Sequence, residues 1–543
     1  MTLAVATGSF ALTSVAQNAP GATPSNQSPS GSPQSAATLD NLPALFVNSE
    51  LSASGVQQRS GATSQARVGY YARRFNRQLI GLPLQSKASF DLPRGARYEI
   101  VYDRRVDHPS GNTTWIGHVQ GYGDDYRTII TVGQTGVSGR ILTPDGDFIV
   151  ESDQDGEWLI DVQASGLTAV GPGEQDALIP PPEALDPIIK KKHPPQGLSA
   201  EPTDNADEPA SVSSDANSCE NLPPTQDAIR NPTTINVMIL YTPGMVDNYG
   251  NNLSTRLDQL VAIGNQAYLD SGVAINLRVV HTQQVDYSDR TTNTAALNAL
   301  TKGRNPALAD VAYLRNFYGA DLVSLVRPFN VRTSGGSCGV AWLGGANGQA
   351  ISRYSNLAYS VVSDGTDAHG RYYCLDLSFV HELSHNMGSA HDRAHADTQG
   401  ACPYSYGYGI EGTFGTVMSY INPRIGQFSN PNIFTCKNLV CGTVNENNAL
   451  SLNNTRNDVA NFRPPVSTLT VVKSGGGRVF SSPAGIRCGR DCNENYPIGT
   501  DVTLTAIPAR GHEFAGWGGA CTGTSISCTV KMTAAQAVSA TFK

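Results

Sequence analysis

The sequence predicts an α/β domain with a mostly parallel sheet and a motif-bearing helix, set between a β-rich N-terminal unit and a small all-β C-terminal unit. Strand and helical patterns alternate along its central part. They lie at 235–241 (strand), about 252–270 (helix), 275–280 (strand), about 307–318 (helix) and 321–326 (strand). Because each helix carries the chain back to start the next strand, this order favours parallel pairing.

Further elements complete the central domain, for which we expect the bounds 234–463. An edge strand is predicted at 338–343, another strand at 358–362 and a closing helix near 448–462. The flanking units, 40–165 and 466–543, show short alternating segments between Gly and Asp turns. Two β-rich units around one α/β domain are therefore expected.

The remaining segments carry other signals. Residues 1–16 are apolar and end in small residues without a basic start, so they are either a truncated signal peptide, which we favour, or an ordinary N-terminus. Residues 17–39 are expected to be a disordered leader. Residues 166–233 are Pro-rich and then acidic, which predicts an exposed linker, and Lys190-Lys191-Lys192 within it is either a processing site or a solvated charge run.

Composition excludes several classes of protein. The net charge of −8 gives no electrostatic basis for binding nucleic acid. No run of 18 apolar residues occurs, so no membrane span is predicted. Ten cysteines without a CxxC pair favour disulfides in an exported protein over structural zinc. The spacings Cys488–Cys492 and Cys521–Cys528 suggest two local disulfides in the C-terminal unit.

The chain is organised around residues 381–392, HELSHNMGSAHD. On a helix expected to begin near Leu377, His381 and His385 lie one turn apart on one face, so both imidazoles can bind one ion. Gly388 can adopt a backbone turn that ends the helix, and the returning chain delivers His391 as a third ligand.

Three neutral imidazoles leave the fourth tetrahedral position of one catalytic Zn²⁺ to water. The ion lowers the pKa of that water to about 7, and Glu382, which is not a ligand, can accept the proton. The pattern therefore predicts metal-assisted hydrolysis.

Together with Val417-Met418-Ser419-Tyr420, this pattern resembles the metzincin zinc endopeptidases. Asp392 is similar to the acid of the adamalysin (reprolysin) branch, which bonds to backbone near the Met-turn. Four further stretches are similar to a bacterial secreted group that includes peptidyl-Asp metalloendopeptidases. They are 236–243, 318–323, 338–342 and 428–431.

The resemblance implies that His381, His385 and His391 bind zinc, that Glu382 is the general base, and that Met418 forms an apolar floor. Tyr420 is expected to stabilise the oxyanion, as in the astacin and serralysin branches; the alternative is a packed loop tyrosine. His369 and His395 are expected at the surface.

Arg424 follows the Met-turn, where metzincins line the pocket for the residue after the scissile bond. A guanidinium there would favour an acidic side chain, although a surface arginine is at least as common. Cys219 either ligates the zinc as a latency switch or pairs with Cys402, leaving Cys338–Cys374 and Cys436–Cys441; we favour the disulfide.

The expected function is a secreted bacterial zinc endopeptidase made as a zymogen, acting on protein or peptide substrates. Residues 40–165 would be the propeptide, with a permanent binding domain as the alternative. The substrate would lie along the edge strand near Val340. The C-terminal unit, with Trp517 expected in its core, is expected to bind a surface polymer or protein. The hypothesis from another class is an adhesin with a vestigial metal site.

Overall fold

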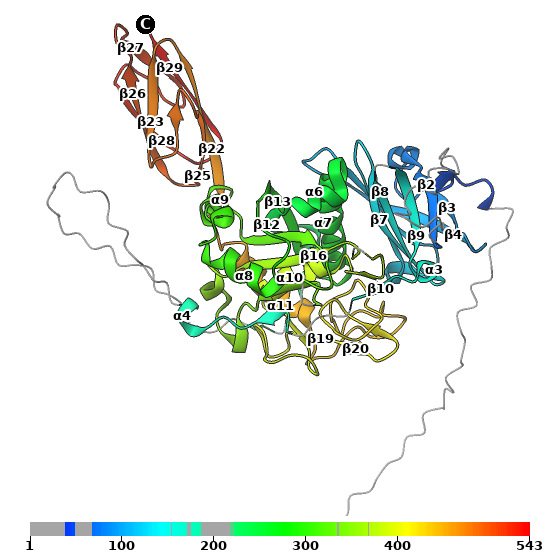
Figure 1. Ribbon diagram of the computed structural model, residues 1–543. Helices are drawn as coiled ribbons and strands as arrows, with labels where there is room; N and C mark the ends of the chain where they lie inside the picture. Colours follow the sequence, from blue (N-terminus) through cyan, green and yellow to red (C-terminus); the bar gives the residue numbers. More distant parts are fainter. Residues whose placement is uncertain are drawn as a thin grey trace, which may run out of the picture. The chain divides into compact units, whose positions relative to one another are not determined.

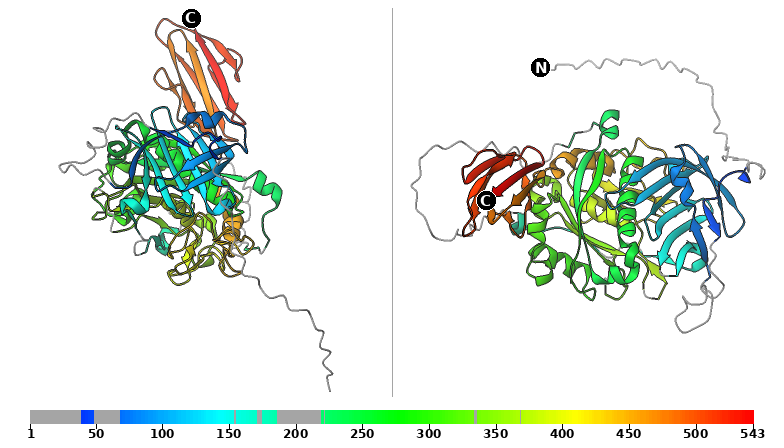
Figure 2. Two further views of the ribbon diagram at one scale, coloured as in Figure 1. Left: turned by 90° about the vertical axis from the view of Figure 1, so that its right-hand side faces the viewer. Right: turned by 90° about the horizontal axis from the view of Figure 1, so that it is seen from above.

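The computed structural model describes residues 39–48, 68–153, 155–170, 175–185, 219–220, 222–333, 336–367 and 369–543. The predictions for residues 1–16, for most of the leader and for Lys190-Lys191-Lys192 lie outside these ranges. Helices and strands are labelled in Figure 1, and Figure 2 gives two further views.

The first unit is a nine-stranded antiparallel sheet in the order β1-β2-β9-β8-β7-β6-β5-β4-β3. Its strands are β1 (Phe46–Asn48), β2 (Tyr70–Phe75), β3 (Lys87–Asp91), β4 (Arg97–Asp107), β5 (Thr113–Val119), β6 (Arg127–Val132), β7 (Val137–Thr143), β8 (Gly146–Asp153) and β9 (Gly156–Asp161). Ser89 of β3 exchanges backbone hydrogen bonds with Pro43 and Leu45, just before β1, so the sheet closes into a barrel. Aromatic and branched side chains fill it, with Phe90, Trp115 and Ile130 almost fully buried.

The central domain contains a six-stranded sheet in the order β11-β15-β16-β14-β12-β13. Its strands are β11 (Ala177–Leu178), β12 (Thr233–Tyr241), β13 (Ile275–Gln284), β14 (Leu322–Pro328), β15 (Gly339–Trp342) and β16 (Tyr359–Asp364). All pairings are parallel except β15 with β16. The expected mixed α/β character and the flanking β units are confirmed.

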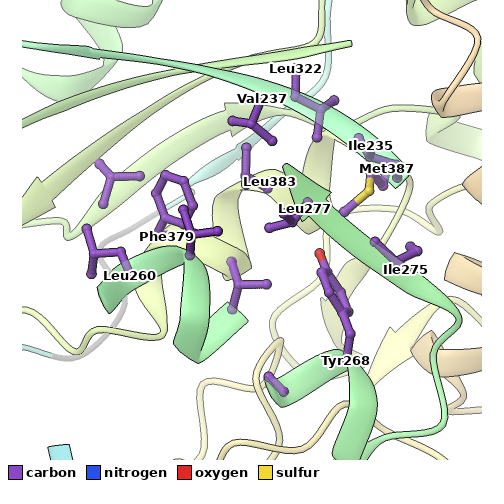
Figure 3. Packing of buried hydrophobic residues seen from close by; sticks show 14 of the residues in the cluster. Ile235, Val237, Leu260, Tyr268, Ile275, Leu277, Leu322, Phe379, Leu383 and Met387 are labelled. Atoms are coloured by element: carbon purple, nitrogen blue, oxygen red, sulfur yellow. The ribbon is translucent and has the colours of Figure 1, made fainter. Parts of the chain in front are cut away.

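Helices cover both faces of this sheet because its strands alternate apolar side chains toward both. On one face pack α7 (Leu253–Asp270), α10 (Ser378–Asn386) and α11 (Asn448–Val459); on the other pack α8 (Asn293–Lys302) and α9 (Val311–Phe317). Figure 3 shows Phe379 and Leu383 of α10 among Leu260, Leu277 and Val237. This core fixes α10 against the sheet. The sequence patterns do not predict two of the helices, α6 (Pro243–Tyr249) and α8.

The C-terminal unit consists of two four-stranded sheets around one small core that includes Trp517. Its strands are β22 (Val466–Ser474), β23 (Gly477–Ser482), β24 (Arg487–Cys488), β25 (Asn493–Pro497), β26 (Asp501–Pro508), β27 (Phe514–Gly519), β28 (Ser527–Lys531) and β29 (Gln536–Phe542). Both suggested disulfides, Cys488–Cys492 and Cys521–Cys528, are present. In a unit this small such cross-links compensate for limited apolar burial.

The interval 166–233 differs from the exposed linker that was expected. Within it, β10 (Thr168–Ala169) pairs with β17 (Tyr372–Tyr373), and β11 joins the central sheet beside β15. The edge of β15 near Val340 is therefore occupied by the chain's own residues. Pro-rich and acidic composition alone could not indicate this pairing. The backbone groups of these short segments form hydrogen bonds with strands that lie far away in the sequence.

No helix in the described ranges is long and apolar enough to span a membrane.

Candidate metal centre

Helix α10 positions the first two histidines. Leu377 precedes its first turn, close to the predicted start, and all nine helical residues are buried. Gly388 follows with φ +96°, a conformation that favours glycine, and a Cβ there would lie 2.5 Å from the Cβ of Ala401. The turn leads into β18 (Ala390–Asp392), which carries His391 back to the helix.

The three imidazoles converge as the spacing predicted. The Nε2 atoms of His381 and His385 lie 3.0 Å apart, and the ring centroid of His391 is 5.3 Å from that of His381 and 4.6 Å from that of His385. Nδ1 of His381 donates to the carbonyl of Val417 (2.8 Å), and Nδ1 of His385 donates to that of Ser389 (2.7 Å). These bonds leave both Nε2 lone pairs facing the centre.

Burial favours the neutral form of His381 and His385. It lowers the pKa of His381 below its ordinary value and that of His385 to about 3. A neutral imidazole is the form that binds a metal.

A fourth group, Asp176, completes the cluster. Its Oδ1 lies 2.6 Å from Nε2 of His391 and 3.5 Å from Nε2 of His385, and its Oδ2 lies 3.5 Å from Nε2 of His381. One ligand atom from each of the four buried residues falls within 4.8 Å of the others. Three imidazole nitrogens and one carboxylate are a donor set suited to a tetrahedral divalent metal.

No motif or spacing in the sequence pointed to Asp176. It lies 244 residues before Tyr420, in an interval whose acids suggested only solvation. Its carboxyl has a pKa well below the ordinary value: burial opposes this shift, but the electrostatic and hydrogen-bonding interactions with the three surrounding histidines outweigh it. An ionised carboxylate at this point can serve as a metal ligand.

Glu382 lies beside the cluster without joining it. Its side chain is buried, and its Oε2 has no hydrogen-bond partner among the described residues. Burial and the charge of Asp176 raise its pKa well above the ordinary value, against Arg424. A Cβ on Gly339 of β15 would lie 2.3 Å from Oε1 of Glu382, so only glycine leaves room for this carboxylate.

The Met-turn is joined to the third histidine through Asp392. The Oδ2 of Asp392 accepts from the backbone N–H of Tyr420 (2.8 Å) and from Oγ of Ser419 (3.0 Å), which confirms the contact implied by the resemblance. Met418 is fully buried in the core. The hydroxyl of Tyr420 donates to Oδ1 of Asp176 (2.7 Å), and its ring lies 4.2 Å from that of His391. Tyr420 therefore faces the cluster.

Of the other candidates, His369 is exposed and His395 is an exposed side chain bonded to Asp392 at 2.7 Å. Neither belongs to the cluster. Arg424 is partly buried, and its Nη2 donates to the carbonyl of Val170 at 3.4 Å. Cys219 forms a disulfide with Cys402 (Cα–Cα 5.7 Å), which excludes the metal-ligating alternative in this form. Cys338–Cys374 and Cys436–Cys441 are also paired, as favoured.

The segment around Asp176 is aligned by backbone pairing. The N–H of Ala341 donates to the carbonyl of Asp176, and that of Leu343 to the carbonyl of Leu178, both at 2.8 Å. The N–H of Val170 donates to the carbonyl of Tyr373 at 2.8 Å. Asp176 is therefore presented to the histidines from a strand that occupies the edge of β15.

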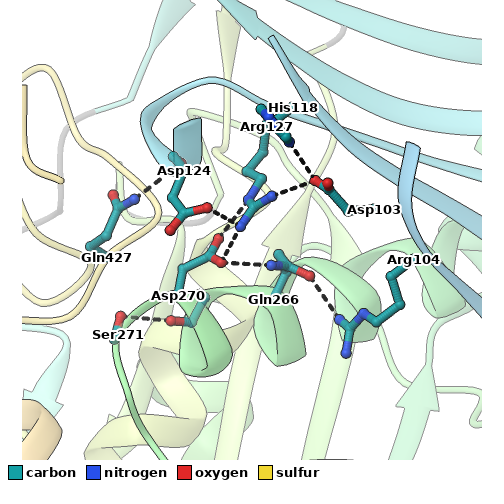
Figure 4. A network of polar contacts seen from close by, with 10 residues as sticks. Asp103, Arg104, His118, Asp124, Arg127, Gln266, Asp270, Ser271 and Gln427 are labelled. Atoms are coloured by element: carbon teal, nitrogen blue, oxygen red, sulfur yellow. Dashed lines mark hydrogen bonds and ion pairs between the residues drawn. The ribbon is translucent and has the colours of Figure 1, made fainter. Parts of the chain in front are cut away.

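A second contact joins the N-terminal barrel to α7 (Figure 4). Arg127 of β6 bonds to both oxygens of Asp270 on α7, at 2.9 and 2.5 Å, and also to Asp103 (2.8 Å) and Asp124 of its own barrel. Arg104 donates to Gln266 at 2.7 Å. Beside this network Ile116 and Ile129 pack on Ala262 and Ile263 of α7. Sequence reasoning missed this interface.

Comparison with known proteins gives three domain matches. Residues 231–447 match a reprolysin-like metallopeptidase family, M12B. Residues 45–164 match a BamI lipocalin-like domain, and residues 467–543 match a divergent InlB B-repeat domain.

The similar named proteins are bacterial. A peptidyl-Asp metalloendopeptidase from Pseudomonas aeruginosa is 33% identical over 275 residues, covering 46% of this chain and 44% of that protein. One from Xanthomonas campestris pv. campestris is 27% identical over 236 residues, covering 43% and 52%. The chain thus spans about half the length of these relatives. A crystal structure of metalloproteinase-II from Bacteroides fragilis aligns over 66% of this chain and 93% of that one at 13% identity, with a TM-score of only 0.34.

Proposed function

We propose that this protein, whose residues 231–447 match the reprolysin-like M12B metallopeptidases, is a secreted zinc-dependent endopeptidase made as a latent zymogen. The observation that carries the proposal is the buried convergence of His381, His385 and His391, with Glu382 beside them. The five disulfides and the bacterial relatives support export to an oxidising compartment.

His381, His385 and His391 would hold one Zn²⁺, which when bound supplies Lewis acidity and lowers the pKa of water. Glu382 takes the proton of the attacking water and returns it to the departing amine. Its burial next to Gly339 limits the directions in which the carboxylate can point. Tyr420, whose hydroxyl donates to Oδ1 of Asp176 at 2.7 Å, would donate to the developing oxyanion once Asp176 is removed.

Asp176 supplies the latency. Its carboxylate stands where the attacking water must bind, and the backbone around it fills the strand edge that a peptide would use. Both obstructions belong to the region before the metallopeptidase domain, so removal of that region opens the site. The β-rich unit and the segment up to residue 185 therefore act as a propeptide.

The substrate class follows from the relatives. Both are named peptidyl-Asp metalloendopeptidases, and we extend to this chain the hydrolysis of peptide bonds next to aspartate. The C-terminal unit is proposed to bind a surface polymer or protein.

Zinc content and casein hydrolysis after removal of the propeptide test the proposal. We expect about one zinc per chain and hydrolysis that a chelator abolishes. Glu382→Ala should abolish hydrolysis with zinc retained, while Glu411→Ala, at an exposed position, should change neither. Zinc-loaded, propeptide-free protein without hydrolysis would instead favour the adhesin with a vestigial metal site.

A further inference from the structure

His391 reaches the metal centre in a different way from the other two histidines. His381 and His385 share α10, and each ring donates from Nδ1 to a backbone carbonyl. His391 comes from the short strand β18, after the turn at Gly388, and its contact with Asp176 is one that activation would remove. After activation the position of His391 therefore depends mainly on the backbone on either side of it.

One loop, residues 400–405, holds that backbone on both sides, and we call it the bracing loop. The N–H of its Ala401 donates to the carbonyl of Gly388 at 2.9 Å. The carbonyl of its Ser405 accepts from the N–H of Ala390 at 2.8 Å. The bracing loop thus contacts the returning chain just before and just after the turn.

The packing between the bracing loop and the turn is close. A Cβ on Gly400 would lie 2.0 Å from the carbonyl oxygen of Gly388, and a Cβ on Gly388 would lie 2.5 Å from the Cβ of Ala401. Beyond the loop, β19 (Tyr406–Gly407) pairs with β18. A shift of the bracing loop would therefore displace the strand that carries the third histidine.

The bracing loop is itself anchored by two residues that lie after the propeptide in the sequence. Its Cys402 is fully buried and forms the disulfide with Cys219, whose Sγ lies 3.4 Å from the carbonyl oxygen of Ala401. The hydroxyl of Tyr404 donates to the carbonyl of Glu220 at 3.1 Å. These contacts, one of them covalent, fix the loop to the start of the metallopeptidase domain.

The anchor also limits where an activating cut can fall. Asp176 precedes Cys219 in the chain, so a cut between them separates the inhibitory carboxylate from the anchor. A cut just after Cys219 would leave the propeptide tied to Cys402 through the disulfide. Only the first kind of cut both frees the metal centre and keeps the anchor.

We propose that the Cys219–Cys402 disulfide is a positioning element of the metal site, which holds His391 in place through the bracing loop and stays in the mature enzyme. The inference rests on the proposed zinc site and deepens it, because it names what fixes the third ligand. Groups that orient a metal ligand from outside the coordination sphere contribute about 10- to 100-fold to metal affinity. Loss of the disulfide should therefore weaken zinc binding by about tenfold or more.

Zinc affinity of the full chain tests the proposal, measured by competition with a chromophoric chelator. The parent protein carries Glu382→Ala, which prevents self-cleavage. Cys219→Ala combined with Cys402→Ala should weaken zinc binding by about tenfold or more relative to this parent. Cys488→Ala combined with Cys492→Ala, which removes a disulfide of the C-terminal unit, is the matched control and should leave the affinity unchanged. Equal affinities in the two variants would overturn the proposal.

A double-mutant cycle separates positioning of a ligand from general stabilisation. If the disulfide acts through His391, then His391→Ala should cost less zinc affinity without the disulfide than with it. His385→Ala removes a ligand that α10 holds, so its cost should be the same in both backgrounds. Additive costs at both histidines would assign the disulfide a structural role only.

A second measurement needs no cysteine substitution, should that variant fail to fold. Because linkage is reciprocal, a disulfide that strengthens zinc binding must be favoured by zinc to the same degree. In a buffer of reduced and oxidised glutathione, alkylation and mass spectrometry give the oxidised fraction of each pair. Saturating zinc should favour the Cys219–Cys402 disulfide by about tenfold or more and leave Cys488–Cys492 unchanged. A Cys219–Cys402 equilibrium that ignores zinc would contradict the proposal.

The mature protein supplies the last test, since its intact mass shows whether Cys219 is retained. An active mature enzyme that begins after Cys219 would refute the role of the disulfide, because its metal site would work without the anchor. A wild-type protein that binds no zinc contradicts the proposed function itself. A protein that binds zinc equally well with and without the disulfide leaves that function standing and overturns only the inference about Cys219.

Discussion

The N-terminal region contacts the metallopeptidase domain in two places of different character. In the cleft, short strands and a single carboxylate meet the histidines, and most of the contact is backbone pairing. On α7, a folded barrel contributes a buried ion pair, a carbonyl that accepts a hydrogen bond from Gln259, and apolar side chains over several turns of the helix. The cleft contact involves few groups, whereas the α7 contact supplies buried area and charge pairing.

This difference suggests that the two contacts have different roles, one in inhibition and the other in attachment. Few hydrogen bonds in an extended segment are worth little in net free energy. Removing one partner of a buried ion pair such as Arg127–Asp270 is strongly destabilising, because the other charge stays buried without compensation. We therefore expect α7 to hold the propeptide in place and Asp176 to make that attachment inhibitory.

The largest effect should come from breaking the cleft contact. In the uncleaved chain, Asp176→Ala should raise hydrolysis of a fluorogenic peptide by at least about 100-fold, because the carboxylate no longer excludes water from the centre. Electrophoresis must show that the chain stays uncleaved. Asp145→Ala, an exposed acid of the barrel, is the control. Equal activity in both variants would mean that Asp176 does not inhibit.

A smaller effect is expected from breaking the α7 contact. Arg127→Ala leaves Asp270 buried without its arginine, which should cost about 2 kcal/mol, or about 30-fold in affinity. Gel filtration of cleaved protein over a dilution series measures how much propeptide stays bound. Arg105→Ala, which removes an exposed arginine paired with Asp107 in the same barrel, should have little effect. If Arg127→Ala and Arg105→Ala lost the same amount of bound propeptide, the Arg127–Asp270 pair would not hold it in place.

Tyr420 belongs to the cleft contact but should act in both forms of the protein. Tyr420→Phe removes the hydrogen bond to Asp176, so the uncleaved chain should gain a few-fold in activity. In the mature enzyme the same change should lower kcat by tenfold or more with zinc retained, because an oxyanion donor is lost. Tyr313→Phe, at an exposed tyrosine, should change neither value. Unchanged kcat in the mature enzyme would assign Tyr420 to packing alone.

The same contrast explains what the sequence could predict. The histidine motif follows helical spacing plus one glycine turn, so local geometry brings His381 and His385 together and Gly388 returns His391. Strand and helix order likewise indicated the α/β domain. Both kinds of prediction depend on neighbours along the chain.

The contacts of the N-terminal region depend instead on residues far apart in sequence. Asp176 and Tyr420 are 244 residues apart, and Arg127 and Asp270 are 143 apart. The local sequence around Asp176, in a Pro-rich interval, and around Arg127, on a β-strand, is the same as that around solvent-exposed charged residues. Only tertiary packing shows that Asp176 faces histidines and that Arg127 faces an acid of α7.

The smallest expected effect is a pH dependence confined to the α7 contact. Burial raises the pKa of Asp270 to about 6 from the ordinary 3.8, although Arg127 opposes the shift. Because the attached state binds this proton more tightly than the separated state, Asp270 should favour attachment most below pH ~4 and lose that contribution as pH rises through about 6.

Relative to Asp270→Asn, which does not titrate, the wild type should therefore lose about 1 kcal/mol of attachment between pH 4.5 and pH 5.5. Urea-induced release of the cleaved propeptide at the two pH values measures the difference. A constant difference would show that the Arg127 pair fully offsets the burial of Asp270. Attachment would then owe more to that charge pair than to the apolar contacts of Ile116 and Ile129 with α7.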